Sequence, residues 1–91
     1  MNDLTLENLD RCFEMAKRSE AKFIGVAIRV PNAPTKEIII NGRENFEAKI
    51  EYYKKTYDND LSHKIVGDIL KIVGFTYGNT FAKIQDDLLG S

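Results

Sequence analysis

The fold is decided by residues 23–41, which read FIGVAIRVPNAPTKEIIIN. Residues 23–30 alternate in character, and one face of the resulting strand carries four branched side chains: Ile24, Val26, Ile28 and Val30. Residues 31–35 contain both prolines, which remove backbone donors and disfavour helix before them, so we expect a turn. A second strand is expected at residues 37–41. Because the connection is short, the two strands should form an antiparallel hairpin.

A helix is predicted on each side of this hairpin. Over residues 4–21, apolar side chains recur at steps of three and four, as in an amphipathic helix: Leu6, Leu9, Phe13 and Ala16. Asp3 or Thr5 can cap its first turn. A second helix is predicted from Arg43 to Tyr57, with an inward face of Phe46, Ile50, Tyr53 and Tyr57. Asn41 and Glu44 have the spacing of a capping box before it.

The rest of the chain predicts one more strand and one more helix. Residues 58–68 are expected to form an irregular loop with one short helical turn. Residues 70–77 alternate and predict a third strand. Gly78-Asn79-Thr80 should end that strand and cap a last helix, whose inward face would hold Phe81, Ile84 and Leu88.

The element order is therefore helix, strand, strand, helix, strand, helix. We expect one domain over residues 1–91, and we interpret the final Gly90-Ser91 as a cloning remnant. Three strands need helices on at least one side of the sheet, so we expect a two-layer α+β domain with helices covering a three-stranded sheet. The consecutive isoleucines at residues 38–40 point to both faces, which favours cover on both. A leftover sheet edge or apolar face favours a homo-oligomer.

Composition argues against several classes of protein. Lys and Arg number 13 and Asp and Glu 14, so the net charge of −1 argues against a nucleic-acid binder or a polybasic membrane-surface protein. No apolar run approaches the roughly 20 residues of a membrane span, and the polar, acidic start is not a secretory signal. A single cysteine fits a reducing compartment, so we expect a cytoplasmic protein. One cysteine and one histidine cannot make a Cys/His zinc site.

The motifs point to neither catalysis nor a cofactor. Cys12 and His63 are the one possible thiol–imidazole pair, but Cys12 lies at the edge of an apolar helix stripe, which favours packing. Asp58-x-Asp60-x-Ser62 starts like a calcium loop, yet His63 stands where glycine is needed and Ile69 where a bidentate Glu is needed. The sequence has no GxGxxG or Walker A pattern. We therefore expect no enzyme activity, no metal and no cofactor.

A binding surface is indicated by tyrosines interleaved with basic residues in the second predicted helix. Tyr53 and Tyr57 lie on its apolar stripe, which favours packing, whereas Tyr52 lies off the stripe and suits stacking on a base or anchoring an interface. Lysine and arginine side chains can hold phosphates. The predicted ligand-binding residues are Arg29, Arg43, Asn45, Tyr52, Lys54, His63 and Lys64. For His63 the alternative is a solvated loop residue, and for Arg29 a snorkelling side chain or an ion pair.

A resemblance adds a biological setting. Residues 38–41 (IIIN), 44–49 (ENFEAK), 51–57 (EYYKKTY) and 73–78 (VGFTYG) resemble uncharacterised small accessory proteins of phages and prophages of low-GC Gram-positive bacteria. The resemblance spans residues 23–88 and carries no catalytic motif. It implies a non-enzymatic protein of the host cytoplasm that binds a host factor. Such a protein would antagonise antiviral defence by sequestering a nucleotide signal or blocking a defence protein. The alternative is a structural or regulatory subunit that acts only through protein contacts.

Overall fold

A computed structural model describes residues 3–89 of the chain. The final Gly90-Ser91, the predicted cloning remnant, lies outside the described residues. The elements are α1 (Leu6–Arg18), β1 (Phe23–Arg29), β2 (Glu37–Gly42), the 3₁₀ turn η1 (Arg43–Asn45), α2 (Phe46–Thr56), β3 (Ser62–His63), β4 (Gly67–Gly78) and α3 (Phe81–Leu89). These elements confirm the α+β class.

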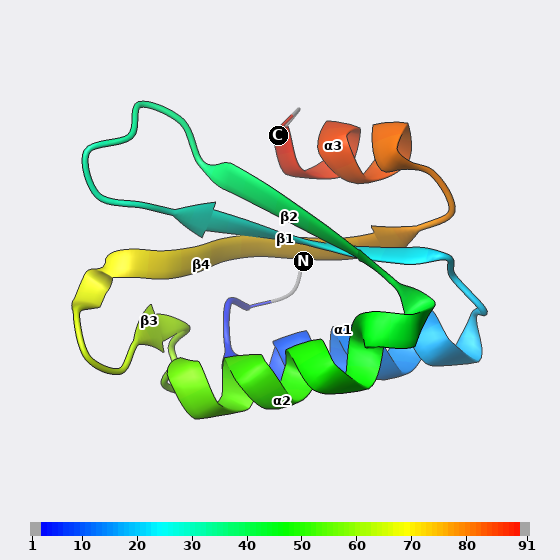
Figure 1. Ribbon diagram of the computed structural model, residues 1–91, viewed down its shortest axis with the longest axis horizontal. Coiled ribbons are helices and arrows are strands. Elements are labelled where there is room, and N and C mark those ends of the chain that lie inside the picture. Colours follow the sequence, from blue (N-terminus) through cyan, green and yellow to red (C-terminus); the bar gives the residue numbers. More distant parts are fainter. Residues whose placement is uncertain (1–2, 90–91) are drawn as a thin grey trace.

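The strands form one antiparallel sheet in the order β2-β1-β4-β3 (Figure 1). β1 pairs with β2 from Phe23 opposite Gly42 to Ile28 opposite Glu37, which confirms the predicted hairpin. The prediction of three strands is wrong, because β3 forms inside the expected loop and β4 begins at Gly67. Gly67 has a φ of 74°, a conformation that glycine adopts without steric cost, and this lets the chain reverse between β3 and β4.

Helices cover both faces of this sheet, so the predicted two-layer arrangement is wrong. α1 and α2 lie side by side on one face, and α3 lies on the other (Figure 1). The central strand explains the difference: Ile24, Val26 and Ile28 pack in the large core with α1 and α2. Ala27 points the other way and packs with α3. Because both faces of β1 are apolar, each needs its own cover.

α1 begins and ends with local signals. Thr5, one of the two predicted caps, accepts a hydrogen bond from a backbone N–H of the first turn. At the other end, Ala21 N donates to Ala16 O and Glu20 N donates to Lys17 O, with Glu20 at a φ of 56°. This is a Schellman motif, which satisfies the last carbonyls of the helix. The predicted stripe is buried at Leu9, Phe13 and Ala16.

The second helix begins later than predicted. Arg43–Asn45 form a 3₁₀ turn, and the α-helix starts at Phe46. The predicted capping box is absent, because no side chain caps η1 or α2. The predicted inward face is confirmed, since Phe46, Ile50, Tyr53 and Tyr57 are all buried.

The last helix buries two of the three residues predicted for its inward face, Ile84 and Leu88. Thr80 Oγ1 accepts a hydrogen bond from Lys83 N at 3.1 Å, which confirms the predicted cap. Ile84 is fully buried, but Phe81 is 54% exposed, so its predicted inward position is wrong. The Phe81 ring instead lies edge-on to Phe23 with centroids 4.8 Å apart, at the end of the sheet where less of the ring can be covered.

Candidate functional site

Three predicted binding residues, Lys54, His63 and Lys64, meet where α2 ends. Tyr57 follows the helix in an extended conformation and forms an isolated β-bridge with His63. The backbone N–H of Lys64 donates to the carbonyl oxygen of Thr56 at 3.0 Å. Lys64 is therefore held beside the last turn of the helix that carries Lys54.

A tight turn at residues 58–61 completes this end of the molecule. Asp58 N donates to Ser62 O, and Leu61 N donates to Asp58 O, both at 2.8 Å. Leu61 has a φ of 67°, which leucine rarely adopts, and its side chain is fully buried. The buried leucine anchors the turn to the core, and the polar side chains of residues 58–60 stay exposed.

These segments surround a surface cavity of ≈ 490 Å³, which we call the α2-end cavity. Its lining residues are Leu6, Lys54, Tyr57, Asp58, Asn59, Asp60 and Lys64. The lining contains two ammonium groups and two carboxylates, so its formal charges cancel. The cavity offers cations and hydrogen-bond acceptors at the same time.

The two lysines of the cavity differ in their partners. Lys54 Nζ lies 3.4 Å from Asp10 Oδ1, whereas Lys64 has no ion-pair partner within residues 3–89. Asp60 accepts a hydrogen bond from Ser62 N at 3.0 Å, and this bond is the largest cause of the lowered pKa of Asp60. Its carboxylate is therefore charged at neutral pH and available as an acceptor.

Aromatic rings run from the core to the edge of the cavity. The ring centroids of Tyr53 and Tyr57 are 5.9 Å apart, and those of Tyr57 and His63 are 5.5 Å apart. Tyr53 and Tyr57 are buried as predicted, and Tyr57, although it lines the cavity, is only 2% exposed and offers a ligand little of its ring. His63 Nδ1 accepts hydrogen bonds from Ile65 N at 3.1 Å and Val66 N at 3.3 Å. His63 itself is not among the residues that line the cavity.

Tyr52 is on the surface as predicted, with 49% of its area exposed. It does not line the α2-end cavity, however. Lys49 Nζ lies 4.9 Å from the centroid of the Tyr52 ring, in a cation–π contact. The structure therefore separates the expected stacking residue from Lys54 and Lys64.

Arg29, Arg43 and Asn45 also lie elsewhere. Arg43 Nη1 donates to Ala21 O at 3.2 Å, and Asn45 is exposed in the same 3₁₀ turn, before the start of α2. Arg29 donates to the Asp68 carbonyl oxygen and lines a different cavity of ≈ 500 Å³. The single site predicted from the sequence is thus divided among separate places.

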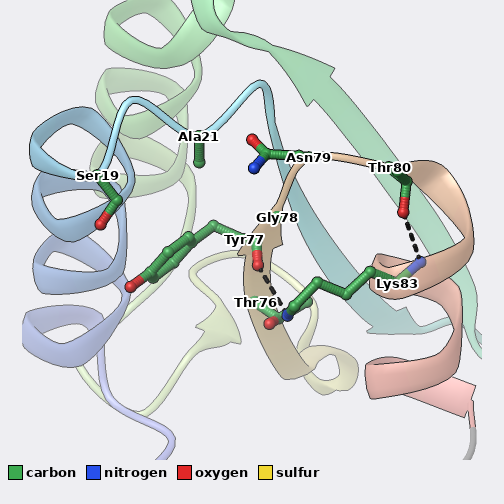
Figure 2. A pocket seen from close by; sticks show the side chains of 8 residues that line it. All are labelled: Ser19, Ala21, Thr76, Tyr77, Gly78, Asn79, Thr80 and Lys83. Carbon is green, nitrogen blue, oxygen red and sulfur yellow. Dashed lines mark hydrogen bonds between the residues drawn. The ribbon is translucent and has the colours of Figure 1, made fainter.

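A further cavity of ≈ 530 Å³ lies between the end of α1 and the start of α3 (Figure 2). It contains none of the predicted residues and is lined by Ser19, Ala21, Thr76, Tyr77, Gly78, Asn79, Thr80 and Lys83. Lys83 Nζ, the one cation of this lining, donates to Tyr77 O at 3.1 Å and to Asp87 Oδ2 at 2.7 Å. Two segments far apart in the sequence, residues 19–21 and 76–83, build this cavity, so no local sequence pattern could reveal it.

The thiol and the imidazole considered for catalysis, those of Cys12 and His63, form no catalytic pair. Burial raises the pKa of the Cys12 thiol to about 12, so the thiol is protonated at neutral pH and acts as a packing residue. No hydrogen bond joins Cys12 to His63 within residues 3–89. In the same range, no group of three or more His, Cys, Asp or Glu side chains could hold a metal ion. Asp58 and Asp60 instead belong to the turn that shapes the cavity.

Comparison with family models, curated proteins and solved structures finds no match to this chain. Among residues 3–89, no helix is both long and apolar enough to cross a membrane.

Proposed function

We propose that the protein is a non-enzymatic binding protein of phage or prophage origin, which acts as a homo-oligomer in the host cytoplasm. Its proposed ligand is a small nucleotide signal of antiviral defence, which it would sequester. The observation that supports a ligand of this kind is the α2-end cavity, which is lined by Lys54 and Lys64 together with Asp58 and Asp60. The phage setting is supported by the resemblance of residues 23–88 alone.

A mononucleotide or small cyclic nucleotide matches the mixed lining of this cavity. Lys64 has no ion-pair partner within residues 3–89 and is the first choice for a phosphate. Lys54 can join it by exchanging its exposed pair with Asp10, which contributes little to stability. The two aspartates can accept hydrogen bonds from ribose hydroxyls or base amino groups. The volume of ≈ 490 Å³ falls within the range of about 300–1,000 Å³ that is typical of ligand sites.

The charge balance of the cavity also selects against larger polyanions. A long nucleic acid needs many cations along its backbone, whereas the carboxylates of Asp58 and Asp60 would repel a second row of phosphates. A ligand with few phosphates and several donors suits this lining. Tyr52, Arg29, Arg43 and Asn45 are not part of the proposed site.

The test is thermal unfolding of the purified protein against a panel of cyclic and linear nucleotides. Ligand at one hundred times its Kd stabilises the native state by about 2.7 kcal/mol, which raises the Tm of a domain this small by on the order of 10 °C. Lys64→Ala and Lys54→Ala should abolish or reduce the rise. Lys55→Ala is the matched control, because it removes the same charge from α2 without touching the cavity.

The outcomes separate this site from the other predicted residues. A rise that disappears in Lys64→Ala and persists in Lys55→Ala supports the proposal. A rise that disappears in Arg43→Ala but persists in Lys64→Ala places the ligand at the other end of α2 and contradicts it. If no nucleotide in the panel raises the Tm, the nucleotide ligand is rejected for that panel, and co-purification with a host protein becomes the next measurement.

A further inference from the structure

The outer edge of β2 has no strand beside it. β2 is the first strand in the sheet order, and its pairing with β1 leaves its other side without a partner among the described residues. Its centre consists of three isoleucines, residues 38–40, that are all only half-buried. Ile38 and Ile40 lie on the face covered by α3, and Ile39 lies on the face covered by α1 and α2.

β2 also lacks the features that usually protect an edge strand. It contains no proline, lysine or arginine, and its register with β1 runs without a bulge from Glu37 to Gly42. The opposite edge is less regular, and β3 covers it only as far as Lys71. β3 is only two residues long, its pairing with β4 is irregular, and Lys83 Nζ binds the Tyr77 carbonyl oxygen of β4. Of the two edges, β2 is the regular one, with six consecutive residues in register with β1 and no strand on their other side among the described residues.

The residues of β2 are complementary to a second copy of themselves. Two β2 strands can pair antiparallel about a twofold axis perpendicular to the sheet, and residues on the same face then lie opposite one another. An axis through Ile39 sets the two Ile39 side chains together and sets Ile38 opposite the second copy's Ile40. Moving the axis to Ile38 would set Lys36 and Glu37 against isoleucines. Moving it to Ile40 would set Ile38 against Gly42.

The same register also places opposite charges beside one another at both ends of the paired strands. An axis through Ile39 sets Lys36 opposite Gly42 of the second copy. The Glu44 carboxylate oxygens lie 2.9 and 3.0 Å from where a Gly42 Cβ would be, so Glu44 covers that position. Lys36 lies on the same face, because it lines a cavity with Val73 and Leu89 on the α3 side of the sheet. Neither Lys36 nor Glu44 has an ion-pair partner within residues 3–89.

From this complementarity we infer that two copies of the chain pair through β2, centred on Ile39, and form one continuous eight-stranded antiparallel sheet. In this dimer, Lys36 of each copy lies beside Glu44 of the other copy, so the twofold axis forms this ion pair twice. Because a twofold contact uses the same edge of both copies, the contact closes at two copies instead of growing into a filament. The inference specifies the oligomer of the proposed function, and it does not depend on the nucleotide ligand.

The test is sedimentation velocity of the full chain without nucleotide, over a range of concentrations. The wild type should reach twice the 10.4 kDa mass of the chain. The dimer contains the Lys36–Glu44 contact twice. Lys36→Glu or Glu44→Lys alone would place like charges at both contacts, so each should raise the dimer Kd by roughly tenfold at low salt, and by less at high salt. Combining both changes restores opposite charges and should return the Kd to near the wild-type value. Lys55→Glu is the matched control and should leave the Kd unchanged.

Each result decides the inference. Restoration of the dimer in the double variant supports the stated register, because only paired positions can compensate one another. A wild type that remains monomeric, or that forms larger assemblies, overturns it. If the dimer Kd is the same in the wild type, in Lys36→Glu and in Glu44→Lys, the two copies meet through another surface and the inference is overturned. Circular dichroism checks that each variant is folded. If one single variant does not fold, the dimer Kd of the double variant is compared with that of the other single variant. The ligand test with Lys54 and Lys64 stands or fails separately.

Discussion

Gly25 should be the position where the sheet is least tolerant of an added methyl group. α3 packs on this part of β1 so closely that a Cβ at Gly25 would overlap Ile84 Cγ2 and lie 3.3 Å from Leu88 Cδ1. Ile84 is fully buried and β-branched, and one rotamer dominates for such a side chain in a helix. Rotation of the side chain therefore cannot relieve the overlap, and α3 must move away from the sheet.

The size of the effect follows from this contact. Gly25→Ala should destabilise the protein by about 1–3 kcal/mol, the usual cost of overpacking a core. Ile84→Ala should cost about 2–5 kcal/mol, because it leaves a cavity under α3. The double variant should be more stable than the sum of the two losses predicts by about 1–3 kcal/mol, since Ile84→Ala removes the methyl group that the new Cβ would strike.

Urea unfolding followed by circular dichroism measures these free energies. Gly74→Ala is the matched control, because its Cβ would meet only the flexible end of Leu88 at 3.3 Å and the Ala27 Cβ at 3.8 Å. We expect Gly74→Ala to lie within about 1 kcal/mol of the wild type. Losses for Gly25→Ala and Ile84→Ala that simply add would refute the reasoning, and so would a Gly25→Ala variant as stable as the wild type.

Three other predictions concern single side chains. Glu20 has a φ of 56° in the Schellman motif of α1, so Glu20→Gly should raise the free energy of unfolding by up to about 1 kcal/mol in a urea titration; a loss of stability would show that the glutamate side chain has another role. Cys12 is buried and its pKa is raised to about 12, so iodoacetamide should modify it only as fast as the protein opens; rapid modification under native conditions, detected by mass spectrometry, would contradict this. Hydrogen bonds from Lys83 and Thr76 lower the pKa of Asp87 from its ordinary value of 3.8. This carboxylate therefore stabilises the fold above that pH, and its contribution is lost as the pH falls through the lower folded-state value. The Tm of the wild type should approach that of Asp87→Asn as the pH is lowered from about 5 to about 2, and parallel curves would exclude a role for Asp87.

The separation of the binding residues shows where local patterns stop being informative. Tyr52, Lys54 and Arg43 are close in sequence and form one basic, aromatic stretch. In the structure, most of α2 lies between Arg43 and Lys54, and Tyr52 does not line the cavity that Lys54 lines. Lys64 lies beside the end of α2 because its backbone N–H donates to Thr56 O and because Tyr57 bridges to His63. Proximity in sequence therefore did not predict which of these side chains lie together: of the seven predicted binding residues, Lys54 and Lys64 line the α2-end cavity.

The sequence by itself determined the elements whose signals are local. The stripe and Thr5 cap of α1, the hairpin of β1 and β2, the buried face of α2 and the Thr80 cap of α3 all depend on residues a few positions apart. Tertiary structure decided β3, the length of β4 and which helices cover each face of the sheet, whereas the isoleucines at residues 38–40 already favoured cover on both faces. Ser62 and His63 become a strand because β4 offers them a pairing edge, and β4 extends to Gly67 for the same reason. These features exist only after distant segments meet, so no short window of sequence contains the interactions that create them.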